Sequence, residues 1–439
     1  MKKITFIIFS MIFLCGCYDA KEPNNIAYVV AVGVDMTEDE GIYDYTIQFA
    51  KTTQISGGAS EEGGKEGNKI VEVINVKAPT VYSAVNIANQ IVSKNFTLAH
   101  TKLIVISEEL AENGVRDLFD TFARNSDIRP NIYMAVSSAG AKEYLKSVNP
   151  VAEINPVTYY RLIYESQRGG YVPRVLLKDF YFQIDDENRQ NVLPLAGVNE
   201  KNEEKAEEGH KDKEEGHKTE TESNVKEDNT KEAEVNEKGF DFLTKKYYAG
   251  KIETEKRNAS EVIGMALFDG EKMIGKMNNV ESLIYNILCG EYKLSYISFY
   301  NEKSPKVPVT IAIEQQRQPK ISVRTTGGVP KIKIKIFIEG CLMSESAETP
   351  IEPDMPSMEK QVEEETKQAI DYFLERTQKE FGVDIIGFGQ YAKANFMTNS
   401  EYEKYDWRSH YPEAEFSVDV SFEMQNIGFI DLGEERNKK

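Results

Sequence analysis

PKIKIKIFIEG (Pro330–Gly340) alternates apolar and polar side chains with a period of two, and EFSVDVSFEMQ (Glu415–Gln425) repeats the pattern. Successive side chains of a strand point to opposite faces of the sheet, so this alternation predicts a sheet with one face in the core and one in water. Between them, residues 357–381 carry apolar side chains at helical spacing and stop at Gly382. We predict a C-terminal domain, 291–439, in which a long helix covers an antiparallel sheet.

The polar face of the first strand carries Lys331, Lys333 and Lys335. These lysines either contact lipid phosphates or form an ordinary solvated strand face, and we favour the second interpretation. The TTGG segment at 325–328 predicts a hairpin turn into this strand, because glycine adopts the backbone angles that such turns need.

The N-terminal part alternates strand and helix signals. IAYVVAVGVD (Ile26–Asp35) is typical of a strand buried on both faces, and YDYTIQFA (Tyr43–Ala50) predicts its partner. Strands and helices then alternate up to about residue 148, which is typical of a mixed α/β layer structure. We predict a mixed α/β (α+β), multidomain fold whose N-terminal α/β domain spans 17–190 and contains a mixed sheet with helices.

A small middle domain is predicted for residues 191–290. VLPLAGVN (Val192–Asn199) resembles a strand, and VIGMALFDGEKMIG (Val262–Gly275) resembles a hairpin. Residues 200–238 between them hold 15 acidic and 8 basic side chains and no aromatic residue. Such a segment buries too little apolar surface to offset its ordering entropy, so we predict a disordered insert. Its EEGHK near-repeat contains His210 and His217, which either bind a metal ion or reflect a low-complexity duplication, the interpretation that we favour.

The first residues are typical of a signal peptide, which we assign to 1–16. Two lysines precede an eleven-residue apolar run, Ile4–Leu14, which is too short to span a membrane. Leu14, Cys15, Gly16 and Cys17 then resemble the bacterial lipobox, in which a small residue precedes the acylated cysteine. We predict that Cys17 carries the lipid, since Cys15 would place bulky Leu14 at the cleavage junction. The alternative is a buried or disulfide-bonded Cys17.

Composition and motifs argue against several function classes. The net charge of −19 and the absence of a basic domain argue against nucleic-acid binding. Cys289 and Cys341 lie in apolar surroundings, which favours buried free thiols over one internal disulfide. His100 and His410 have no serine or cysteine nearby in a nucleophile motif, and no spacing predicts a metal or cofactor site. We predict a protein that is not an enzyme and has no catalytic residues, metal or cofactor.

GCYDAKEPNNIAYVVAVGVD (Gly16–Asp35) resembles the opening of the Ger(x)C spore-germination lipoproteins, the C subunits of nutrient germinant receptors. Those proteins begin Gly-Cys-Trp-Asp and close the first strand with Gly-x-Asp, matched here by Gly33 and Asp35, whereas Tyr18 replaces the tryptophan. Looser matches follow in family order over most of the chain. They are AHTKLIVISEELAENGV with Arg124 and Arg129 after it, GMALFDGEKMIG, DIIGFG with Trp407, and FSVDVSFEMQNIG.

The resemblance implies a three-domain subunit that is lipid-anchored to the outer face of the cell membrane, in spores the inner membrane. It implies integral-membrane A and B receptor subunits as partners and no enzymatic activity. A lipid-anchored extracytoplasmic solute-binding protein and an exported hydrolase are the alternative functions. A solute-binding protein usually has two similar α/β lobes, so the alternating C-terminal sheet favours the receptor subunit. Neither the nutrient nor the contact residues follow from the sequence.

Overall fold

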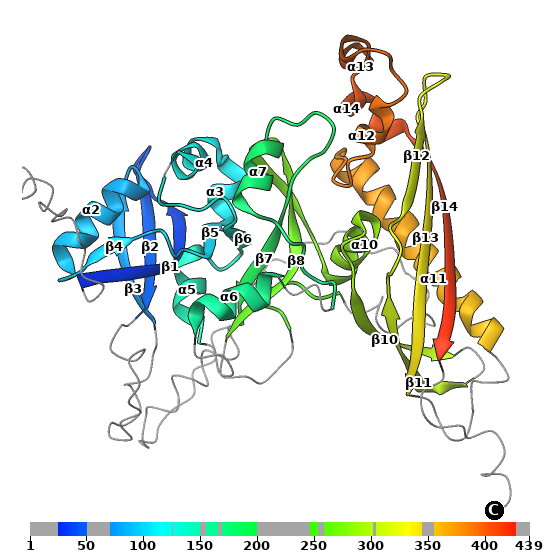
Figure 1. Ribbon diagram of the computed structural model, residues 1–439, viewed down its shortest axis with the longest axis horizontal. Coiled ribbons are helices and arrows are strands. Elements are labelled where there is room, and N and C mark those ends of the chain that lie inside the picture. Colours follow the sequence, from blue (N-terminus) through cyan, green and yellow to red (C-terminus); the bar gives the residue numbers. More distant parts are fainter. Residues whose placement is uncertain are drawn as a thin grey trace, which may run out of the picture.

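The computed structural model describes residues 25–50, 71–124, 126–149, 155–165, 169–199, 246–252, 259–301, 304–344 and 355–426. These residues form two β-sheets, each with its own helices, that lie side by side (Figure 1). The mixed α/β, multidomain fold class expected from the sequence is confirmed. The predicted acyl site at Cys17 and the acidic insert 200–238 lie outside the described residues.

The first sheet has nine strands in the order β3-β2-β1-β5-β6-β7-β8-β9, and β4 pairs with the start of β1. Strands β1, β5, β6 and β7 are parallel to one another, whereas the pairs at both ends of the sheet are antiparallel. The strands are β1 (Ile26–Met36), β2 (Tyr43–Ala50), β3 (Val71–Ala78), β4 (Asn95–Thr97), β5 (Leu103–Ser107), β6 (Tyr133–Ser137), β7 (Val192–Val198), β8 (Ser260–Asp269) and β9 (Lys272–Met277).

Helices cover both faces of this sheet, which explains why its central strands are apolar throughout. In β5, Ile104 and Ile106 belong to the core cluster on one face, and Leu103 and Val105 belong to the cluster on the other. Parallel strands buried on both faces lack polar alternation. The helices are α2 (Val81–Ile91), α3 (Glu108–Asn113), α4 (Arg116–Ala123), α5 (Ala141–Ser147), α6 (Pro156–Glu165) and α7 (Leu177–Gln183).

The middle segment differs from the small domain expected for residues 191–290. Strands β7, β8 and β9 are the strand and hairpin predicted there, but they extend the first sheet through the parallel pairing of β6 with β7. Helix α10 (Asn279–Cys289) then leads toward the second sheet. The sequence places the strands correctly, whereas their partner strand, β6, depends on long-range pairing.

The second sheet has five strands, in the order β10-β11-β13-β12, with β14 along the other edge of β13. Its strands are β10 (Leu294–Asn301), β11 (Ser304–Glu314), β12 (Lys320–Arg324), β13 (Lys331–Ser344) and β14 (Glu415–Asn426). Its helical elements are α11 (Met355–Glu375), the π-helix η4 (Arg376–Phe381), α12 (Phe388–Lys393), α13 (Asn399–Tyr405), α14 (Trp407–His410) and the 3₁₀ turn η5 (Tyr411–Glu413).

Four of these strands are antiparallel as predicted, but β14 runs parallel to β13. Parallel neighbours need a long crossover connection, and the segment that contains α11 supplies it while covering the apolar face (Figure 1). On the outer face, Lys331 lies 3.2 Å from Glu415 and Lys335 lies 3.5 Å from Asp419. These lysines therefore form cross-strand ion pairs on a solvated face, as favoured above.

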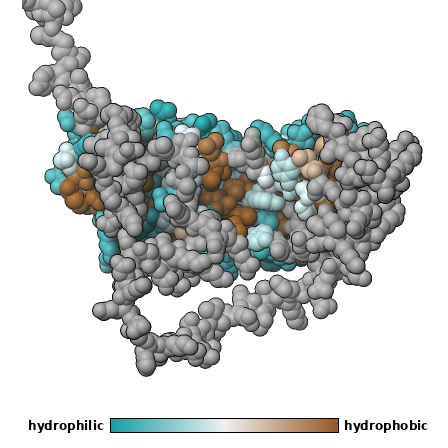
Figure 2. Space-filling view, turned by 90° about the horizontal axis from the view of Figure 1, so that it is seen from below, coloured by the Kyte–Doolittle hydropathy of each residue, from teal (hydrophilic) through white to brown (hydrophobic). Residues whose placement is uncertain are grey.

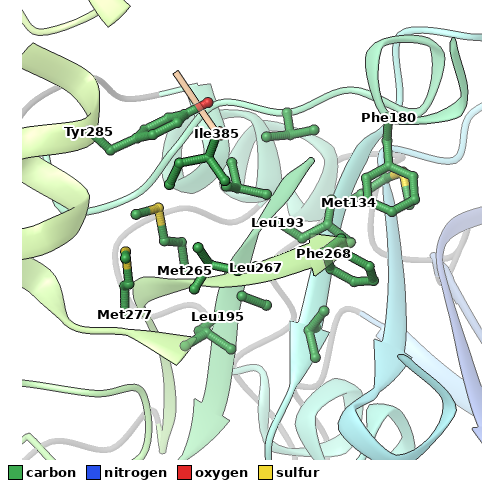
Figure 3. Packing of buried hydrophobic residues seen from close by; sticks show 14 of the residues in the cluster. Met134, Phe180, Leu193, Leu195, Met265, Leu267, Phe268, Met277, Tyr285 and Ile385 are labelled. Carbon is green, nitrogen blue, oxygen red and sulfur yellow. The ribbon is translucent and has the colours of Figure 1, made fainter. Parts of the chain in front are cut away.

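The apolar core is continuous between the two sheets. One cluster includes Met134 and Leu193 of the first sheet, Tyr285 of α10 and Ile385 of the loop after η4. Figure 3 shows these side chains in succession, with Met265 and Met277 between the strands and α10. The two sheets are thus joined by packed side chains.

Candidate functional site

A buried polar cluster lies where the two sheets meet, around Asp384. This residue is 1% exposed, although it carries a carboxylate. The carboxylate accepts hydrogen bonds from the backbone N–H groups of Gly387, at 2.8 Å, and Gly389, at 2.9 Å. It also accepts one from the indole Nε1 of Trp407, at 2.9 Å. Asp384 therefore fixes the DIIGFG turn and holds Trp407 against it.

Burial raises the pKa of Asp384 to about 6, although the N–H donors of Gly387, Phe388, Gly389 and Trp407 act in the opposite direction. Both carboxylate oxygens accept hydrogen bonds within the turn. The charge is thus used to order the backbone, which is the role of a structural carboxylate.

The segment before β7 binds the same turn from the first sheet. The Asp384 backbone N–H donates to Gln190 Oε1 at 2.7 Å, and the Gln190 backbone N–H donates to the Asp384 carbonyl at 2.9 Å. Arg189 donates to the Ile385 carbonyl at 3.0 Å and to the Tyr285 hydroxyl at 2.7 Å. The bonds to Asp384 and Ile385 span 194 and 196 positions of sequence, the bond to Tyr285 spans 96, and together they fix one sheet relative to the other.

The glycines of this turn permit the close approach. A Cβ atom on Gly389 would lie 2.7 Å from the Asn188 carbonyl oxygen and 2.7 Å from Trp407 Cδ1. Gly387 has a φ of 88°, a left-handed angle that favours glycine. The GFG sequence is therefore explained by packing against the first sheet, and its lack of a nucleotide-binding context is consistent with this role.

A second contact between the two parts lies at the start of α10. Glu281 forms a capping box with Asn278 and an ion pair with Arg376 of η4. Burial raises the pKa of Glu281, and Arg376 opposes that shift. Nearby, a Cβ on Gly275 of β9 would lie 2.2 Å from Phe381, so this strand and η4 also pack without space between them.

The Gly-x-Asp sequence that ends the first strand has a separate structural role. Asp35 accepts the backbone N–H groups of Ala141 and Lys142, at 2.7 and 2.9 Å, at the start of α5. A Cβ on Gly33 would lie 3.0 Å from Leu145 of α5. The glycine admits the helix and the aspartate caps it, so both residues dock α5 on β1.

The histidines His100 and His410 and the serine Ser107, which catalysis could in principle use, have structural surroundings. Ser107 caps α3 by accepting the Leu110 backbone N–H at 3.3 Å. His410 stacks on Tyr405, and its Nδ1 lies 3.0 Å from the Asp406 carbonyl oxygen. His100 packs edge-on against Tyr28, with ring centroids 4.9 Å apart, next to the loop before β5.

Cys289 and Cys341 are free thiols that do not form a disulfide, and each is partly buried. Burial raises the pKa of Cys289 to about 11, which keeps this thiol protonated and poorly nucleophilic near neutral pH. Within the described ranges, no group of three metal-ligating side chains gathers in one place. No helix among those same residues has the length and apolar character that a membrane span requires.

The sequence identified only one side of the junction. DIIGFG and Trp407 were noted as family-like positions, and the structure brings them together at Asp384. Asn188, Arg189 and Gln190 were missed, because a short polar run before a strand is ordinary for a loop. Their role follows only from the partner turn that the fold places against them.

Two family models match the chain. The "Spore germination protein N-terminal domain" matches residues 19–198, and the model described as "Spore germination B3/ GerAC like, C-terminal" matches residues 263–428. The unmatched interval between them contains the acidic segment 200–238. The two matches together therefore cover most of the chain.

Individual relatives agree with these models. Spore germination protein KC of Bacillus subtilis (strain 168) is 23% identical over 96% of this chain and 94% of its own. Spore germination protein GerQC of Bacillus cereus is 21% identical over 98% of this chain and 99% of its own. A Bacillus subtilis (strain 168) relative named YfkR is 30% identical over 136 residues, 31% of this chain and 35% of that one.

A solved structure supports the fold. The crystal structure of the GerBC protein superposes with a TM-score of 0.50 at 13% identity, covering 90% of this chain and 97% of that one. The two family models and the full-length relatives place the chain in the Ger(x)C family of spore germination proteins.

Proposed function

We propose that this protein is the membrane-anchored, non-catalytic subunit of a nutrient germinant receptor. A lipid on Cys17 holds it on the outer face of the membrane, in spores the inner membrane. There it docks with the integral-membrane A and B subunits of the receptor. The observation that carries the proposal is the match to spore germination proteins over nearly the whole chain, combined with the lipobox at Gly16 and Cys17.

The use of the buried polar groups supports a non-catalytic role. Burial raises the pKa of Asp384, Asp35 and Glu281, and backbone or side-chain donors hold each of these three carboxylates. Each one caps a turn or a helix or pairs across the junction. Active sites usually place such groups beside a nucleophile or a substrate cleft. These three instead stabilise a turn, a helix start and the contact between the two sheets.

The alternative of a solute-binding protein has less support. Such proteins close two lobes over a cleft by a hinge motion. Here the two sheets are joined by hydrogen bonds through Gln190 and Asp384 and by a continuous apolar core. A junction of this kind favours a rigid platform over a closing clamp.

Replacing the acyl acceptor tests the proposal. Spores that carry Cys17→Ala should lose most of their nutrient-triggered germination, because the chain would no longer be held at the membrane. Cys15→Ser is the matched control, since this cysteine leaves with the signal peptide, and it should change little. Mass spectrometry of the mature N-terminus from the same spores should find the lipid on residue 17.

A second pair of variants separates docking from catalysis. At matched protein level, His410→Ala should leave germination intact, because this histidine stacks on Tyr405 and makes its hydrogen bonds within its own segment, to the Asp406 carbonyl and Ser409. The integral-membrane subunits should co-purify with the wild-type chain from spore membranes. A His410→Ala chain that keeps those partners but no longer supports germination would contradict the non-catalytic assignment.

A further inference from the structure

Helix α2 carries an exposed face without charge. Ile87 and Ile91 lie one turn apart and are 43% and 65% exposed, and Tyr82 is 48% exposed. The helix sequence VYSAVNIANQI contains no charged residue, although 28% of the chain is charged. Val81, Ala84 and Ala88 of the same helix are buried, and the two isoleucines border this buried side. An ordinary surface helix exposes charged side chains, so this composition calls for a physical explanation.

The fold places α2 at the end of the molecule where the described residues begin. Strand β4 follows α2 after three residues, and the Phe96 backbone N–H donates to Asn89 of α2 at 2.8 Å. Asn95 of β4 is the direct partner of Ile26, the first residue of β1. The exposed end of α2 and the start of β1 are therefore neighbours, as Figure 1 shows.

This end also shows apolar surface. In Figure 2, brown atoms gather at the left end of the molecule, the end at which Figure 1 places α2. Single exposed isoleucines are normal on a protein surface, whereas Ile87 and Ile91 lie one turn apart and form a continuous apolar edge on a helix without charge.

The length of chain before β1 fixes what can be in reach. Nine residue steps join Cys17 to Ile26. Even when fully extended, they span at most roughly 30 Å. A chain acylated at Cys17 thus holds the α2 end of the molecule close to the lipid surface.

We propose that the exposed edge of α2 formed by Ile87 and Ile91 lies on the lipid surface that holds the acyl anchor. This inference rests on the acylation of Cys17 in the proposed function. The chain has a net charge of −19, so carboxylates on this face would be repelled by anionic lipids. An uncharged helix edge with two exposed isoleucines avoids that repulsion and places apolar side chains at the interface. The contact would fix which end of the protein faces the membrane.

Tryptophan fluorescence on vesicles tests this contact. The protein has one tryptophan, Trp407, which is 2% exposed and lies in the part formed by the second sheet, so lipid quenchers should not reach it. Ile91→Trp adds a reporter at an exposed position with room for a larger side chain. The full acylated chain is incorporated in vesicles that contain lipids brominated on the acyl chains. Emission of the added tryptophan should fall clearly relative to unbrominated vesicles, because a side chain at the boundary between headgroups and acyl chains lies within reach of the bromine atoms.

Two further variants serve as controls. Met397→Trp adds a tryptophan at a 96% exposed position near α13, far from α2, and its emission should not change with bromination. Ile87→Trp repeats the α2 measurement at a second site, should one substitution disturb folding.

Each outcome decides the matter. Quenching confined to Ile87→Trp and Ile91→Trp supports the contact. A chain that floats with the vesicles but shows equal, weak quenching at both α2 sites and at Met397→Trp overturns it, while leaving the acyl anchor intact. If the α2 sites become shielded only in spore membranes that contain the receptor subunits, the face binds protein and the lipid contact is wrong. A chain that does not float overturns the anchor, and the α2 contact with it.

Discussion

Replacing Asp384 should weaken the junction between the sheets. Asp384→Ala removes the acceptor of three buried N–H groups, from Gly387, Gly389 and Trp407. The Asp384 backbone also bonds to the Gln190 side chain and to the Gln190 backbone. The turn that positions these backbone groups depends on the Asp384 carboxylate. The variant therefore tests whether one side chain organises the contact.

The expected loss follows from two opposing terms. Leaving a buried donor without its acceptor costs about 2 kcal/mol, or about 6 kcal/mol for three donors. Removing the buried carboxylate also removes its desolvation cost, which recovers part of this free energy. Its pKa is raised from 3.8 to about 6, and this shift corresponds to about 3 kcal/mol against the ionised form at pH 7. The free energy of unfolding should thus fall by about 3 kcal/mol.

Urea denaturation followed by circular dichroism and by Trp407 fluorescence measures this loss. Asp419→Ala is the matched control, because this carboxylate pairs with Lys335 on an exposed strand face. Exposed ion pairs contribute at most about 1 kcal/mol. If the two alanine variants unfold at the same urea concentration, the carboxylate of Asp384 does not hold the turn and the reasoning is wrong.

Four further outcomes are expected. Gly389→Ala should destabilise the protein more than Gly327→Ala in thermal unfolding, because a Cβ meets Asn188 and Trp407 at the first site, whereas at the second it meets nothing within 4 Å and only the φ of 99° opposes it; equal losses would mean that crowding at Gly389 costs no more than this backbone strain. The folded-state pKa of Asp384 exceeds its unfolded value, so its stabilising contribution is complete below pH 3.8 and disappears as the pH rises through about 6. Relative to the wild type, Asp384→Asn should therefore gain stability in urea between pH 4 and pH 7, and a constant difference would contradict the shift. Deleting residues 200–238 should leave the melting temperature within a few degrees, since loop length costs only about 0.6 kcal/mol per doubling; a larger drop would mean that the segment packs. Ser107→Ala should cost about 1 kcal/mol through the lost α3 cap, yet leave nutrient-triggered germination unchanged at matched protein level, and a loss of germination would indicate chemistry at this serine.

The sequence determined the elements and the targeting prediction through local patterns. Period-two alternation identified β13 and β14, because side chains of a strand alternate between faces whatever its neighbours are. Helical spacing and the stop of that pattern at Gly382 predicted the helical segment that the structure divides into α11 and η4. The lipobox around Cys17 depends only on adjacent residues, so it too could be recognised without a fold.

Tertiary structure decided the pairing and the junction. Alternation does not specify strand direction, so the parallel pairing of β13 with β14 became evident only from the crossover that contains α11. Strand patterns also do not name a partner, and so β7 to β9 joined the first sheet instead of a separate middle domain. Asp384 meets Gln190 across 194 positions of sequence. No local pattern encodes such a contact, because it depends on two sheets folding first and on glycines that leave space for the approach.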